Sequence, residues 1–117
     1  MATTATDLRP LARASYDAFV AGDRAALERL LADDLTFSSG PDPLLDRQGF
    51  FERCWPGHAH LASFSLQRLV QAGDEVVVTY EATRSDGTRF RNTEVLTFRD
   101  GLIVRQEVYF GWDLPEG

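Results

Sequence analysis

The sequence lacks several residue types, and each shortage excludes a class of chemistry. All 12 basic residues are Arg, so no Lys is present to form a Schiff base with a carbonyl substrate. Cys54 is the only cysteine, which excludes an internal disulfide and a multi-cysteine metal cluster. Two histidines, His58 and His60, are too few for a histidine-rich site, so we expect no metal. A nucleotide-binding glycine fingerprint is also missing, so we expect no organic cofactor.

Positive charge and long apolar runs are scarce as well. The 12 basic residues stand against 18 acidic ones, and the net charge of −6 argues against nucleic acid or an anionic membrane as a partner. No apolar run approaches the roughly 18 residues of a membrane span. The first residues, MATTATDLRP, lack the apolar core of a signal peptide. We therefore expect a cytoplasmic protein.

The 117 residues suffice for one domain, with helices in the first half and strands in the second. Apolar residues at helical spacing, with caps at Thr6 or Asp7, at Asp23 and at Asp46, predict helices over residues 8–21, 24–32 and 46–55. Strand-like runs follow over residues 64–72, 75–84, 89–98 and 102–110, separated by short turns that contain Gly and Asp. Short turns imply consecutive antiparallel pairing, so the predicted class is α+β.

The Asp100-Gly101 turn permits two registers between the strands that it joins. A two-residue turn would pair Arg99 with Leu102, whereas a three-residue turn with a glycine bulge would pair Phe98 with Leu102. A slip of one residue exchanges the two faces of the sheet. We choose the bulged turns because they gather the apolar side chains on one face, namely Val76, Val78, Tyr80, Ala82, Phe90, Leu96, Phe98, Leu102, Val104, Val108 and Phe110.

Three polar residues, Asn92, Glu94 and Gln106, fall on this apolar face beside the Tyr80 hydroxyl. The chosen register places Glu94 opposite Val78 and Gln106, and Asn92 opposite Tyr80. Burying an unpaired carboxylate in apolar surroundings costs roughly several kcal/mol of free energy, so Glu94 must line a cavity or belong to a polar network. Burial should also raise its pKa toward neutrality, which makes Glu94 the best candidate for a general acid or base.

Two parts of the chain carry a family resemblance. They are Ala21-Gly22-Asp23 with residues 30–37 (LLADDLTF), and residues 95–103 (VLTFRDGLI) with Tyr109-Phe110-Gly111. The chain resembles the nuclear transport factor 2-like superfamily, and within it the SnoaL-like and ketosteroid-isomerase-like small proteins. The resemblance implies a single domain over residues 1–117, a cone-shaped α+β barrel with three N-terminal helices packed on a curved antiparallel sheet around an internal pocket. It also implies a homodimer through the outer sheet face, where Glu81, Arg91, Arg105 and Glu107 alternate in charge.

The catalytic pattern of the ketosteroid isomerases carries over to only one position. Their general-base carboxylate falls on Ser39 or Ser38, and their oxyanion tyrosine falls on Ser15, next to Tyr16. Their proton-donating acid falls on Glu94. The inward positions offer no arginine that matches the epoxide hydrolases of the superfamily. The cyclases commonly use an acid at the Glu94 position, sometimes with a histidine.

These observations predict a set of site residues. We expect Glu94 and His60 to be catalytic, since histidine transfers protons near neutral pH. Residues expected to bind a small apolar substrate are Tyr16, Phe19, Phe37, Trp55, His58, Tyr80, Asn92 and Gln106.

Two hypotheses remain from the sequence. In the first, the protein is a cofactor-independent isomerase, cyclase or dehydratase that acts on a compact apolar substrate. In the second, it is a non-catalytic ligand-binding or dimeric assembly module, which the serines at the isomerase base position favour. A cavity beside Glu94 would support the first, and a fully packed interior the second.

Overall fold

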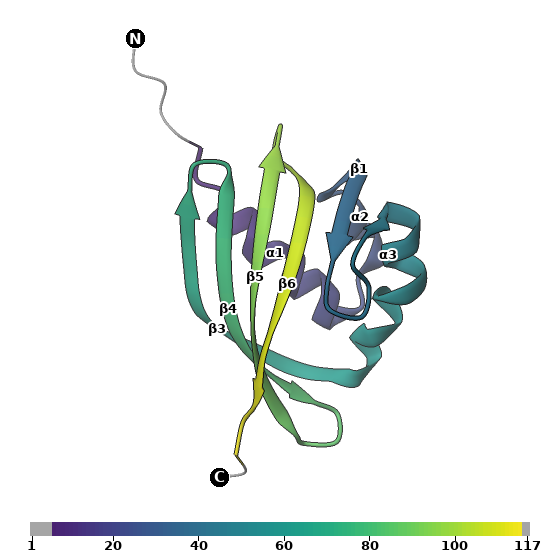
Figure 1. Cartoon of the computed structure of the whole chain (residues 1–117), viewed down its shortest axis with the longest axis vertical. Coiled ribbons are helices and arrows are strands. Elements are labelled where there is room, and N and C mark those ends of the chain that lie inside the picture. Colours follow the sequence, from purple (N-terminus) through teal and green to yellow (C-terminus); the bar gives the residue numbers. More distant parts are fainter. Residues whose placement is uncertain (1–5, 116–117) are drawn as a thin grey trace.

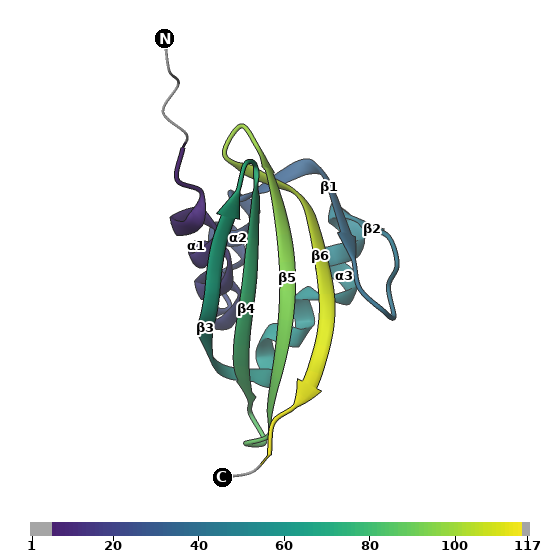
Figure 2. The ribbon, with the colours of Figure 1, turned by 60° about the vertical axis from the view of Figure 1, so that its left-hand side comes forward.

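The computed structural model describes residues 6–115 as two layers, in which helices cover one face of a curved six-stranded sheet (Figures 1 and 2). This arrangement confirms the predicted α+β class. Within this range, no helix is long and apolar enough to cross a membrane. The elements are α1 (Arg9–Ala21), α2 (Arg24–Glu28), β1 (Leu31–Ser38), β2 (Leu45–Asp46), α3 (Arg47–Arg53), the 3-10 helix η1 (Trp55–His60), β3 (Leu61–Ala72), β4 (Glu75–Arg84), β5 (Arg89–Arg99) and β6 (Leu102–Asp113).

Local sequence signals set the ends of α1 and the start of α2. Gly22 ends α1 with a φ of 71°, a left-handed conformation that glycine adopts without steric cost. The Asp23 side chain then caps α2, as predicted. The predicted cap of α1 is displaced by one residue, because Leu8 holds the cap position. Asp7 still accepts a hydrogen bond from the Arg9 backbone N–H at 3.1 Å.

The second and third predicted helices are too long. α2 ends at Glu28, and Leu31 and Ala32 are already buried residues of β1. Pairing with β6 therefore overrides their helical spacing. α3 begins after the Asp46 cap as predicted but ends at Arg53, and the chain continues as η1.

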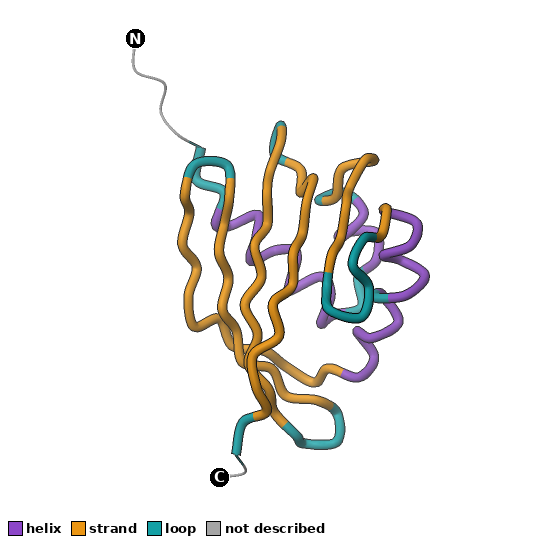
Figure 3. The backbone as a smooth tube through the Cα atoms, viewed as in Figure 1, coloured by secondary structure: helices purple, strands orange, loops and turns teal. Residues whose placement is uncertain are grey.

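The sheet is mixed and open, whereas a cone-shaped barrel with a curved antiparallel sheet was predicted. The strand order is β2-β1-β6-β5-β4-β3, and β1 runs parallel to β6 while the other neighbours are antiparallel. Between residues 6 and 115, the edge strands β2 and β3 do not pair with each other, so the sheet does not close (Figure 3). Parallel neighbours are joined by long crossovers rather than short turns, so no local signal in the sequence indicated the pairing of β1 with β6.

The register between β4 and β5 is the predicted one. Val78 pairs with Glu94, and Tyr80 pairs with Asn92. The predicted three-residue turn between β4 and β5 is also present, since Arg84 N–H donates to the Thr88 carbonyl. The sequence therefore predicted correctly which residues of β5 face the helices.

The register predicted between β5 and β6 is wrong in detail. Arg99 pairs with Leu102 across a two-residue turn, in which Asp100 and Gly101 both have positive φ, as in a type I′ turn. A bulge two pairs further on shifts the register, so that Leu96 pairs with Gln106 and Glu94 with Val108 rather than with Gln106.

Relative to the prediction, the turn shifts the register by one residue and the bulge shifts it by one more. Beyond the bulge the total shift is two residues, so each side chain of β6 keeps its predicted face. Between the turn and the bulge the shift is one residue, and Ile103 is fully buried in place of the predicted Leu102 and Val104. At the far end of β6, Phe110 was predicted to be inward but is 60% exposed.

A second bulge in β6 depends on Gly111. Arg91 pairs with Trp112 and Asn92 with Phe110, so Gly111 has no partner of its own on β5. Its N–H donates to the Asn92 side-chain oxygen at 3.1 Å. A Cβ at this position would overlap the Arg91 carbonyl oxygen, so only glycine allows the two strands to approach this closely.

Gly111→Ala tests this packing. The added Cβ should separate β5 from β6 and lower the free energy of unfolding by about 1–3 kcal/mol, the usual cost of overpacking. Gly57→Ala is the control, because its Cβ would meet no atom within 4 Å. Urea denaturation followed by circular dichroism measures both variants, and equal stability of the two would contradict the assigned role of Gly111.

Candidate functional site

Glu94 lies in the middle of β5, on the sheet face covered by the helices, and is 5% exposed. Its neighbours on the adjacent strands are Val78 and Val108, both apolar. Leu96 and Val78 are fully buried. The predicted placement of a carboxylate among apolar side chains is therefore confirmed.

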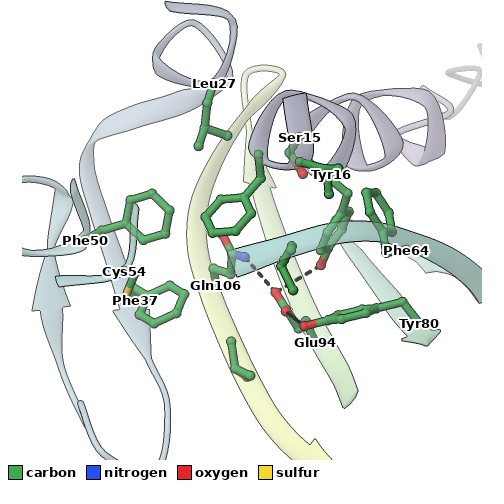
Figure 4. A pocket seen from close by; sticks show the side chains of 14 residues that line it. Ser15, Tyr16, Leu27, Phe37, Phe50, Cys54, Phe64, Tyr80, Glu94 and Gln106 are labelled. Carbon is green, nitrogen blue, oxygen red and sulfur yellow. Dashed lines mark hydrogen bonds between the residues drawn. The ribbon is translucent and has the colours of Figure 1, made fainter. Parts of the chain in front are cut away.

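Three hydrogen-bond donors from three different elements hold this carboxylate (Figure 4). The hydroxyl of Tyr16 on α1 donates to Glu94 Oε1 at 3.0 Å, and the amide of Gln106 on β6 donates to the same oxygen at 2.7 Å. The hydroxyl of Tyr80 on β4 donates to Oε2 at 2.7 Å. A carboxylate oxygen accepts two hydrogen bonds readily, so Oε1 is saturated while Oε2 keeps one free acceptor position.

The electrostatics of this group reflect two opposing effects. Burial raises the pKa of Glu94 above its ordinary value, while the hydrogen bonds from Tyr80, Gln106 and Tyr16 lower it, and the effect of burial is the larger. Burial beside this carboxylate also raises the pKa of both tyrosines, which therefore remain hydrogen-bond donors across the physiological range.

Asn92 supports this arrangement from the next inward position of β5. Its amide nitrogen lies 3.4 Å from the Tyr80 oxygen, and its carbonyl accepts the hydrogen bond from Gly111. Since the Asn92 N–H points at the Tyr80 oxygen, the Tyr80 proton is directed to Glu94. The Gly111 bulge is thus connected to the carboxylate through two side chains.

A cavity of about 120 Å³ lies between α1, α3 and the sheet, and Glu94 forms part of its wall. The other lining residues are mainly apolar, and the described chain contributes no basic residue to this wall: Ser15, Tyr16, Phe19, Val20, Leu27, Phe37, Phe50, Cys54, Leu61, Phe64, Tyr80, Gln106 and Val108. An apolar cavity of ~150 Å³ holds benzene. This cavity is smaller, so it can enclose no more than about one small ring.

Five of the eight residues predicted to bind a substrate line this cavity, namely Tyr16, Phe19, Phe37, Tyr80 and Gln106. Asn92 instead contacts the Tyr80 hydroxyl from behind. Trp55 is buried with its ring edge-on to Phe19, at 5.6 Å between ring centroids.

The two histidines lie outside the cavity wall. The His58 ring stacks on Trp55 at 4.4 Å between centroids and packs against Gly22. His60 is exposed at the end of η1. The geometry does not bring His60 to Glu94, because the predicted loop is a 3-10 helix that directs the chain from α3 into β3.

The serines at the family's catalytic positions do not contact Glu94. Ser38 pairs with Glu107 in the sheet, and the Ser15 hydroxyl donates to the Ala12 carbonyl at 2.7 Å. Tyr16 reaches the carboxylate in place of Ser15.

Tyr16 was predicted to bind substrate, but its hydrogen bond to Glu94 was not predicted. The apolar stripe of α1 accounts for its inward position. Tyr16 lies four residues after Ala12 and eight after Leu8, and both of these are buried. By contrast, nothing in the sequence indicated that Cys54 and Phe64 would line the cavity. Burial raises the pKa of Cys54 to about 11, so its thiol is protonated at neutral pH.

No group of three His, Cys, Asp or Glu side chains in residues 6–115 is arranged to hold a metal ion. The polar groups that hydrogen-bond to one another at this site are Glu94, the two phenols and the amide of Gln106.

Comparison with solved structures shows what this fold is similar to. A candidate ketosteroid isomerase from Kribbella flavida DSM 17836 superposes with a TM-score of 0.74 at 20% identity, covering 94% of this chain and 83% of that one. The candidate polyketide cyclase IdmH from Streptomyces antibioticus gives a TM-score of 0.70 at 24% identity, with 88% and 91% covered. A de novo designed protein with a curved β-sheet gives 0.79 at 13% identity, with 89% and 84% covered.

The sequence comparisons agree with the fold. No curated protein matches this sequence significantly. The sequence model of the SnoaL-like domain matches residues 12–106, which include most of α1, both tyrosines, Glu94 and Gln106. The chain therefore belongs to the SnoaL-like domain family.

Proposed function

We propose that the protein binds a compact, largely apolar molecule in the cavity beside Glu94 and transfers a proton on it. The observation that carries this proposal is a buried carboxylate with no basic residue around its cavity, held by three donors in one orientation. Burial raises the pKa of Glu94, which brings a carboxyl group closer to the range in which it can both accept and return a proton.

The proton would be taken by Oε2, the oxygen that accepts only one hydrogen bond. When Glu94 removes a proton from a carbon next to a carbonyl, the electron pair of the C–H bond moves onto the carbonyl oxygen. Glu94 becomes neutral in that step and is then a weaker acceptor. The Tyr16 and Tyr80 hydroxyls can turn from it to the new oxyanion, since their raised pKa values keep them protonated.

Because Glu94 is the only carboxylate on the wall of this cavity in the described chain, the same group would return the proton to a second carbon. Such a step is an isomerisation, and loss of a hydroxide or closure of a ring from the same enolate gives a dehydratase or cyclase. These are the cofactor-independent reactions that the sequence suggested. The solved relatives named as candidate isomerase and cyclase support this choice by analogy of fold alone.

A non-catalytic binding module is the second candidate function. One observation favours it: Gln106 donates to Glu94 at 2.7 Å and the cavity is small, so the carboxylate is held in place without a ligand. A ligand would then bind without any proton leaving it, which separates the two candidates by experiment.

Hydrogen–deuterium exchange of small cyclic ketones tests the proton transfer. In D₂O the wild-type protein should accelerate exchange at the carbon next to the carbonyl of cyclohexanone or 3-cyclohexen-1-one, as followed by NMR. Glu94→Gln should reduce the rate to that of buffer, because an amide cannot accept the proton. Glu52→Gln, an exposed residue of α3, is the matched control and should retain the wild-type rate.

Two outcomes would contradict the proposal. If the wild-type protein binds these ketones but leaves their exchange at the buffer rate, the binding module is the correct function. If Glu94→Gln exchanges as fast as wild type, Glu94 is not the base.

The pH dependence of stability tests the environment of Glu94. Burial raises the pKa of Glu94 in the folded protein above its pKa in the unfolded chain, which is near the ordinary value of 4.5. The contribution of Glu94 to the free energy of unfolding is therefore fully present below the unfolded-state pKa. The contribution is lost as pH rises through the folded pKa, and each tenfold difference between the two acid dissociation constants corresponds to about 1.4 kcal/mol. Urea denaturation from pH 4 to 8 should show wild type losing stability relative to Glu94→Gln. A difference that stays constant with pH would contradict a raised pKa.

We also propose that two copies pair through the outer sheet face. Charged groups of both signs lie there, and Arg91 Nη1 donates to Glu81 Oε2 at 2.8 Å. Such a face fits a copy of itself around a two-fold axis.

Light scattering after size-exclusion chromatography measures this association. The wild-type protein should elute at twice the mass of its 117-residue chain. Val95→Arg, in the middle of this face, should elute as a monomer, while Ala25→Arg on the exposed side of α2 should remain dimeric. A monomeric wild type would refute the dimer and leave the Glu94 site unaffected.

A further inference from the structure

A second hollow of about 470 Å³ lies against the Glu94 cluster and is open to solvent. It shares five lining residues with the enclosed cavity, so the two spaces are adjacent: Phe37, Cys54, Tyr80, Glu94 and Val108. Most of the remaining wall comes from the far ends of β4, β5 and β6. We call the two spaces the inner cavity and the outer hollow.

The Gly111 bulge shapes this outer hollow. Without the extra residue, Trp112 would pair with Phe90 and share its inward face. With it, Phe90 pairs with Asp113, and Trp112 pairs with Arg91. A short side chain therefore takes the position that the indole would otherwise fill.

Large apolar side chains around the outer hollow are left uncovered. Phe110 is 60% exposed and Trp112 is 63% exposed, although the protein is small and acidic overall. Phe90 and Tyr80 add two further rings to the wall. Exposed aromatic side chains gathered around a concavity are typical of a ligand site.

The two spaces differ in the basic residues that line them. Arg84 is the only basic residue among those that line either of them in the described chain. Its guanidinium lies 4.4 Å from the centroid of the Phe90 ring, and its Nη1 donates to the Thr88 hydroxyl at 3.1 Å. These contacts fix a positive charge on the wall of the outer hollow.

Asp113 is the group that competes for Arg84. The distance from Arg84 Nη2 to Asp113 Oδ1 is 3.6 Å, and the two side chains are 39% and 81% exposed. A long, exposed pair of this kind contributes little to stability, so Arg84 can exchange this partner for a ligand.

We propose that the outer hollow is a second compartment of the ligand site, and that it takes the carboxylate end of an aromatic carboxylic acid. The neutral ring end then lies in the inner cavity beside Glu94. This orientation follows from the position of Arg84, which lines the outer hollow and not the inner cavity, whereas Glu94 lines both. The inference rests on the proposed binding of a small molecule beside Glu94, and it adds the class of that molecule.

Binding of 2-naphthoate and its neutral isostere 2-naphthamide tests the proposal. Their dissociation constants are measured by titration calorimetry at low salt. We expect the wild-type protein to bind 2-naphthoate about tenfold more tightly than the amide, the ratio typical of one charge-assisted contact. Arg84→Gln should abolish this preference and leave affinity for the amide unchanged, while Arg84→Lys should retain part of it. Asp113→Asn should strengthen the preference by removing the competing carboxylate.

Arg89→Gln is the matched control, because it removes the same charge from the same end of the sheet at a residue outside both spaces. It should keep the wild-type preference, and thermal melting confirms that each variant is folded. The proposal is overturned if Arg84→Gln retains the preference, if Arg89→Gln loses it equally, or if neither naphthalene binds at millimolar concentration. Ketone exchange that depends on Glu94 in the same preparations would show that the inner site functions and that only the outer compartment is wrong.

Discussion

The structure depends on how one carboxylate is kept inside an apolar interior. Burying the Glu94 carboxylate costs roughly several kcal/mol in lost hydration. In the described part of the chain, no positive charge on the wall of the inner cavity offsets this cost. Three neutral donors from α1, β4 and β6 do so instead. These elements are far apart in the sequence, so the network forms only when helix and sheet are assembled. The same network leaves one carboxylate oxygen with a free acceptor position, which connects the stability of the fold to its chemistry.

The fold alone does not specify an activity. A designed protein shares this fold, with a TM-score of 0.79, and a candidate isomerase and a candidate cyclase share it too, with TM-scores of 0.74 and 0.70. What distinguishes this chain is the set of side chains on the concave face of the sheet. The resemblance to the ketosteroid isomerases implies serines at the positions of their base and phenol, and in this structure Tyr16, next to Ser15, donates to Glu94. The site therefore combines a familiar scaffold with a single acidic group.

Features that depend on local interactions were predictable from the sequence, whereas features that depend on distant ones were not. Alternating apolar residues and a short turn determine the pairing of Val78 with Glu94, and thus the burial of the carboxylate. The parallel pairing of β1 with β6 joins segments about 70 residues apart, and no local pattern encodes it. The bulges of β6 depend on close backbone approach at Gly111, which a lone glycine does not reveal. The position of His60 depends on a 3-10 helix where the sequence predicted a loop.

The central claim is that Glu94 is buried among apolar side chains and holds its proton more tightly than an ordinary carboxyl group. The direct measurement is an NMR titration of the ¹³C-labelled side-chain carboxyl of Glu94, assigned by comparison with Glu94→Gln. We expect a midpoint clearly above the ordinary glutamate value of 4.5, since the effect of burial exceeds that of the three donors. A midpoint at or below that value would show that the donors dominate or that solvent reaches the carboxylate, and the proposed role of Glu94 as acid and base would be wrong.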